Sequence, residues 1–156
     1  MKKLLLIAIL AVAGVAAAVA QPRAIGANLG WGLDVSYQHS LGEANMIDLS
    51  VNIPFFDGIG ATATYDWINP FGTAIPWNEK GEWNWSLGVG AGAGIYGFKS
   101  PAVYVGAVGH IGVEYNFWFP LQLSVDYRPN IGWNFGANHF NTAGFYGATL
   151  GVRYLF

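Results

Sequence analysis

The sequence contains no cysteine and few charged residues, and each of these features excludes some classes of protein. Without cysteine, the 156-residue chain forms no disulfide and carries no lipid-modified cysteine after its apolar N-terminal run. Charged residues make up 10% of the chain, with seven basic against nine acidic, so no basic patch is available for nucleic acid. Past residue 20 no apolar run reaches the length of a transmembrane helix, although 53% of the residues are hydrophobic. The hydrophobicity must therefore be distributed over strands.

The first twenty residues have the features of a secretory signal peptide. Lys2 and Lys3 precede an apolar run over residues 4–19, and the ending Ala18-Val19-Ala20 suits signal peptidase. Cleavage leaves Gln21 first, with five basic residues (seven less Lys2 and Lys3) against nine acidic ones. The alternative is an uncleaved inner-membrane anchor, because the run is nearly long enough to span a bilayer. We expect a signal peptide at 1–20 and a single domain at 21–156.

The chain does have a sustained alternation of apolar with polar or glycine residues. Near the C-terminus, Leu150, Val152 and Tyr154 are apolar, and Gly151 and Arg153 stand between them. A period of two indicates a strand whose two faces meet different surroundings. The same pattern marks seven segments: 24–38, 46–55, 59–67, 82–95, 103–117, 121–128 and 147–156.

Seven strands are one fewer than the even number that a single-chain bacterial barrel normally has. The eighth strand is expected in one of two irregular stretches. One candidate is Phe71 to Trp77, within residues 68–81, and the other is Ile131 to Phe135, within residues 129–143. The choice reverses the side of the membrane that the middle turns face, so the orientation of the loops stays open.

The bulky face of these strands is expected to point outward. A soluble barrel would place its apolar face inside, but an eight-stranded barrel has an interior only just wide enough to be filled by side chains. Here one face carries Trp, Tyr, Phe, Leu and Ile, and the other is largely Gly, Ser, Thr and Asn. The small face fits inside, and the bulky face needs hydrocarbon around it. The predicted fold is all-β: a closed antiparallel transmembrane β-barrel of eight strands.

Two groups of motifs resemble those of known proteins. The ending with Thr149, Gly151, Tyr154 and Phe156 resembles the C-terminal assembly signal of bacterial outer-membrane β-barrels. Residues 112–117, 120–129 and 151–154 resemble the short outer-membrane β-barrel family of Gram-negative envelopes. The resemblance implies export through the periplasm, recognition by the barrel-assembly machinery, a final strand that closes the sheet onto the first, and residence among outer-membrane lipids. It implies an architecture rather than an activity.

Ionisable residues on the inward face are the candidate functional group. In a narrow lumen such charges must pair or meet water. One interpretation is a structural network in which Arg128 and Arg153 are shared among the acids. The other is a narrow cation-preferring path, since the inward carboxylates outnumber the arginines and glycines at 88, 90, 92 and 94 would leave one wall open. The predicted members are Asp34, Asp48, Asp66, Glu82, His110, Glu114, Asp126, Arg128 and Arg153.

The sequence gives little support to catalysis. His39, His110 and His139 include no pair spaced to bind a metal, and no Ser-His-acid set stands at recognisable spacing. We expect no enzyme activity, cofactor or metal, and a monomer with a structural or surface-interaction role. The narrow pore is the alternative, and a lipid-modifying barrel enzyme is a third hypothesis.

Overall fold

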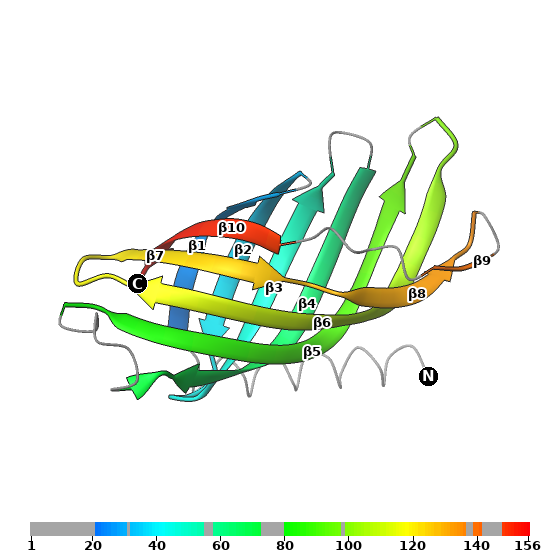
Figure 1. Ribbon diagram of the computed structural model, residues 1–156. Helices are drawn as coiled ribbons and strands as arrows, with labels where there is room; N and C mark the ends of the chain where they lie inside the picture. The colour runs from blue at the N-terminus through cyan, green and yellow to red at the C-terminus, as the bar shows by residue number, and fades with distance from the viewer. Residues whose placement is uncertain are drawn as a thin grey trace.

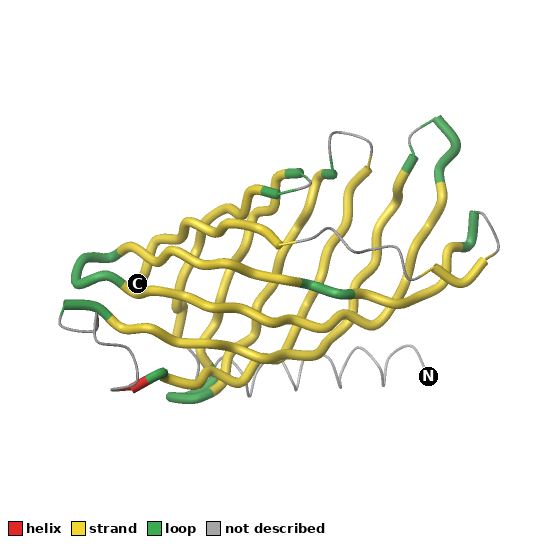
Figure 2. The backbone as a smooth tube through the Cα atoms, in the orientation of Figure 1, coloured by secondary structure: helices red, strands yellow, loops and turns green. Residues whose placement is uncertain are grey.

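The computed structural model describes residues 21–30, 32–54, 58–72, 80–97, 99–136, 139–141 and 148–156. The predicted signal peptide lies outside the described residues. Most of the described backbone is strand, and the loops gather at the two ends of the molecule (Figure 2). Within the described ranges, no helix combines the length and the apolar character that crossing a membrane requires. The strands are β1 (Gln21–Leu29), β2 (Leu33–Ser40), β3 (Asn45–Ile53), β4 (Gly58–Pro70), β5 (Glu82–Tyr96), β6 (Ala102–Asn116), β7 (Leu121–Tyr127), β8 (Asn130–Asn134), β9 (His139–Asn141) and β10 (Ala148–Leu155).

The strands close into an antiparallel barrel with eight positions in its wall. Hydrogen-bonded neighbours follow the order β5-β4-β3-β2-β1-β10-β7-β6, and pairing of β5 with β6 closes the ring. β8 continues β7 along β6 in one register, since Ile111 lies opposite Tyr127 and Val108 opposite Asn130. β9 pairs with β8 as β10 pairs with β7 (Figure 1). The prediction of a closed, eight-stranded, all-β barrel is confirmed.

The prediction of a single strand over 24–38 is wrong, and this segment supplies the missing eighth strand. β1 and β2 form a hairpin in which Leu29 lies opposite Leu33. Three residues, 30–32, separate this pair, so Leu29 and Leu33 stay on one face and the period of two continues through the turn. The other proposed locations of the eighth strand are also wrong. Ile131 lies in β8, which continues β7, and Phe71 and Gly72 follow the end of β4, with 73–79 outside the described residues.

The bulky face points outward, as predicted. Leu87 is 46% exposed, whereas its neighbour Ser86 is 3% exposed, and this alternation recurs along the wall strands. Among the described residues, the buried apolar side chains are those of Ala24, Met46, Tyr104 and Val108, and the remaining buried residues are mostly polar or charged. The core of this barrel is therefore polar, and its apolar surface lies on the outside.

The strand registers place one continuous path of apolar residues around the outside. Following cross-strand partners from Val105 on β6 leads round the barrel and back to Tyr115 on β6, ten residues further along the strand. An offset of ten in eight strands corresponds to a strand tilt of about 40°. The path consists of Val105, Ala93, Ala61, Val51, Val35, Ala27, Val152, Leu123 and Tyr115.

Candidate functional site

Arg153, on β10, is the centre of the buried polar network. Its side chain is inaccessible to solvent, and its three guanidinium nitrogens make five hydrogen bonds. Nη2 donates to Asp126 at 2.9 Å, which makes a charge-assisted pair. A side chain at Gly151 would crowd this group, since a Cβ there would lie 3.0 Å from Nη1. The other acceptors are Ser36, Gln122, Ser124 and Asn28, at 2.6 to 3.1 Å.

His110, on β6, bridges two carboxylates from different strands. Nδ1 lies 3.1 Å from Asp66 on β4, and Nε2 lies 2.9 Å from Asp126 on β7. Ionised carboxylates only accept hydrogen bonds, so this geometry is that of an imidazolium that donates from both nitrogens. The contact with Asp66 passes over β5 at Gly88, where a Cβ would lie 1.4 Å from Asp66 Oδ1. Asp126 then joins the two cations, because its other oxygen accepts from Arg153.

Arg23 pairs with Glu114 towards the end of the barrel where the C-terminus lies, and the sequence analysis missed it. The pair makes two contacts, of which Nη1 to Oε2 measures 3.1 Å, and Gln122 donates to the same carboxylate at 3.0 Å. By alternation Arg23 belongs to the outer face. The register of β1 shifts between Pro22 and Ala24, and such a bulge re-aims one side chain. The sequence feature that could have pointed to Arg23 is its place as an isolated arginine directly after Pro22.

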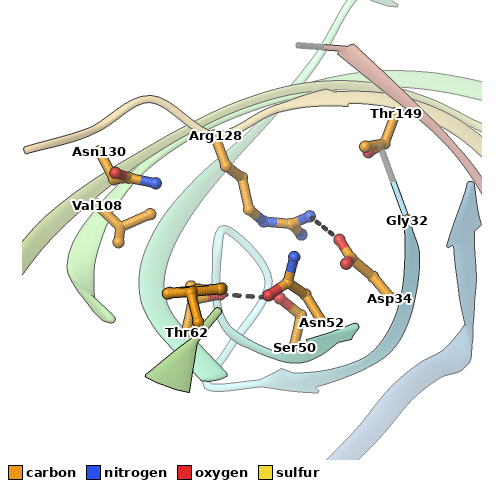
Figure 3. A pocket seen from close by; sticks show the side chains of 10 residues that line it. Gly32, Asp34, Ser50, Asn52, Thr62, Val108, Arg128, Asn130 and Thr149 are labelled. Atoms are coloured by element: carbon orange, nitrogen blue, oxygen red, sulfur yellow. Dashed lines mark hydrogen bonds and ion pairs between the residues drawn. The ribbon is translucent and has the colours of Figure 1, made fainter. Parts of the chain in front are cut away.

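Arg128 lies where β7 ends, and it holds the remaining inward acids. Its Nη2 donates to Asp48 at 3.0 Å, and its Nη1 lies 3.9 Å from Asp34. A cavity of about 50 Å³ adjoins this group. Figure 3 shows Arg128, Asp34 and Asn52 directed into the same space.

The structure brings together eight of the nine predicted members of the lumen network and separates the ninth. Asp34, Asp48, Asp66, His110, Glu114, Asp126, Arg128 and Arg153 take part in the ion pairs described above. Glu82 lies at the first position of β5 and is exposed. Its place in the alternation is inward, but the wall ends there and its side chain reaches solvent.

The predicted assembly signal lies on β10, which closes the barrel against β1. Tyr154 and Phe156 are exposed on the outer face, at 54% and 67%. Gly151 faces inward beside Arg153, and Thr149 donates to the backbone of Asp126. Recognition of these residues by the assembly machinery stays a prediction.

Three interior side chains lie close enough together to be considered as metal ligands. Asp48, Asp66 and His110 bring potential ligand atoms within 4.8 Å of one another. A metal there would displace the bonds of Asp48 to Arg128 and of His110 to Asp66, so the geometry fits an ion-pair network better. Both His110 nitrogens are already bonded to carboxylates, which leaves neither to activate a hydroxyl. The expected lack of enzyme activity stays a prediction.

Comparisons with known proteins add no relative to this picture. Neither a scan against protein-family models nor searches of curated proteins and solved structures give a match for the chain.

Proposed function

We propose that the chain is a small integral protein of the Gram-negative outer membrane, with a filled lumen and a structural or surface-interaction role. One observation carries the proposal: the barrel buries its charges and exposes its large hydrophobic side chains. Soluble monomers rarely expose a contiguous apolar area of this kind, and their fully buried residues are mostly apolar rather than polar and charged. A closed barrel in hydrocarbon accounts for both features, since it leaves no strand edge unpaired in lipid.

The height of the apolar surface also supports a membrane location. On β5 the exposed large hydrophobics run from Trp85 to Ile95. Ten residue steps in a strand tilted by about 40° cover roughly 25 Å along the barrel axis. This height matches the apolar band, about 25 Å tall, of known outer-membrane barrels.

The filled lumen favours a structural role over the pore alternative. The guanidinium of Arg153, on β10, projects into the interior and has partners on β1, β2 and β7. The space over the glycines of β5 is occupied: Asp66 lies over Gly88, and the ring of Tyr96 lies over Gly94. The cavity beside Arg128, of about 50 Å³, has room for a few water molecules. These contacts favour a packed interior over an open cation path.

Refolding into phospholipid vesicles tests the membrane proposal. The chain from Gln21 onward should become heat-modifiable on a gel only with vesicles or detergent present. Folding to a monomer in plain buffer would overturn the membrane location.

Planar-bilayer recordings of the same preparation test the filled lumen, with Asp34→Asn beside the wild type. We expect no steady conductance from either protein. Steady cation-selective steps that shrink in Asp34→Asn would establish the pore and overturn the structural role.

A further inference from the structure

The described interior holds one more carboxylate than it has cations. The carboxylates are those of Asp34, Asp48, Asp66, Glu114 and Asp126. The cations are Arg23, Arg128 and Arg153, together with His110 as an imidazolium. An unbalanced charge inside a narrow barrel is costly, because little water is present to solvate it.

Pairing distances identify Asp34 as the unmatched carboxylate. Arg23 pairs with Glu114, Arg153 with Asp126, and His110 with Asp66. Arg128 donates to Asp48 at 3.0 Å, whereas its closest contact with Asp34 is 3.9 Å, beyond hydrogen-bonding distance. Asp34 therefore shares a cation whose charge is already matched by Asp48.

Asp34 also lines the interior cavity, whose other walls carry oxygen atoms. Ser50, Asn52, Thr62 and Thr149 contribute hydroxyl and amide groups to the lining. Figure 3 places the Asp34 carboxylate at the edge of this space, opposite Arg128. The Nε of Arg128 is buried without a hydrogen-bond acceptor, in contrast to the fully bonded guanidinium of Arg153. The cavity thus combines an unmatched negative charge with an unused donor.

We propose that this cavity binds a hydrated monovalent cation of the sodium class beside Asp34. Carboxylate, hydroxyl and amide oxygens are ligands for hard cations. A single positive charge balances the interior, and a water molecule on the cation accepts the hydrogen bond from Arg128 Nε. A divalent ion would leave an excess positive charge, and an anion would be repelled by Asp34 and Asp48. The site is distinct from the membrane proposal, because it depends on the interior alone.

Unfolding of the folded barrel in a neutral detergent tests this site. The midpoint of unfolding is measured in sodium chloride and in N-methylglucamine chloride at equal ionic strength. N-methylglucamine serves as the comparison because this organic cation is too large for a cavity of about 50 Å³. Sodium should raise the wild-type midpoint in a saturable manner, as expected for a ligand that binds only the folded state. Asp34→Asn should abolish the difference between the two salts. Glu82→Gln, which removes one negative charge from the exposed rim, should retain it.

Asn52→Lys provides a second test that does not remove the carboxylate. Asn52 lies opposite Asp34 in the β2–β3 ladder and lines the same cavity. A lysine there supplies the missing charge, so the folded variant should lose its dependence on sodium. Equal midpoints of the wild type in both salts would overturn the proposal and leave a proton on Asp34. A sodium effect of the same size in Asp34→Asn would also overturn it, as a general salt effect.

Discussion

Gly88 shows how the absence of one side chain builds the network. The Asp66 carboxylate occupies the position of the missing Cβ and reaches His110 across β5. Gly88→Ala should therefore break this contact, at a cost of about 1–3 kcal/mol in the free energy of unfolding, as for other overpacked interiors. Urea unfolding in detergent measures the change.

Gly92→Ala is the matched control for Gly88→Ala. The nearest atoms to a Cβ at position 92 are methyl groups of Thr62 and Val108, both at 3.0 Å, followed by the backbone oxygen of Ala61 at 3.3 Å. The control should cost less, since the methyl groups move more easily than a bonded carboxylate. An equal loss in both variants would contradict the special role of position 88.

The second prediction for a single residue concerns Arg153. Arg153→Met removes the partner of the buried Asp126 and should destabilise the barrel by about 3–5 kcal/mol, because it leaves an uncompensated charge. Arg153→Lys keeps the charge with fewer donors and should lose less. Lys99→Met, at an exposed turn, should change stability by no more than about 0.5 kcal/mol. A loss in Arg153→Met as small as in Lys99→Met would mean that the network contributes little to stability.

Single residues also mark the limits of reading the site from alternation. Alternation correctly places Asp66, His110 and Asp126 inside, because each lies within a regularly paired strand. It fails for Arg23, which a bulge turns inward, and for Glu82, which sits where the wall ends. Bulges and strand ends depend on neighbouring strands, so a pattern within one strand does not report them.

At the scale of elements, the same alternation hides a turn. The loop over residues 30–32 keeps Leu29 and Leu33 on one face, so β1 and β2 appear as one long strand. Glycines at 30 and 32 fit both a turn and an inward face made of small residues. Length does not reveal the turn either, since a strand over 24–38 would be as long as β5 or β6.

The closing strand carries the prediction for assembly. Phe156 donates its backbone N–H to Arg23, and its side chain is exposed on the outer face. Its removal therefore costs the folded barrel little packing. Phe156→Ala should lower the amount of heat-modifiable barrel in the outer membrane while leaving secretion across the inner membrane intact. Leu150→Ala, on the outer face of the same strand, is the control and should assemble nearly normally. Equal assembly of Phe156→Ala and the wild type would refute the predicted signal.

At the scale of the whole molecule, the direction of the two faces followed from the volume of their side chains. A face of Gly, Ser, Thr and Asn fills a narrow lumen, and only that arrangement leaves room for the buried network. The pairings within the network could not be read from the sequence, because His110 and Asp66 are brought together by the register of three strands. Register is set by the closed ring as a whole.

The outer surface supplies the last prediction. Val89, 56% exposed on β5, lies near the middle of the apolar band between Trp85 and Ile95. Val89→Arg should destabilise the barrel in phospholipid vesicles by about 2–4 kcal/mol, the cost of arginine at the bilayer midplane. Phe119→Arg introduces the same side chain at the exposed turn between β6 and β7, where the cost near the interface is about 0–1 kcal/mol. The two are compared by urea unfolding in vesicles of one lipid. Both wild-type side chains face outward, so the two losses of stability should differ only if hydrocarbon surrounds Val89. Equal losses would mean that water surrounds Val89.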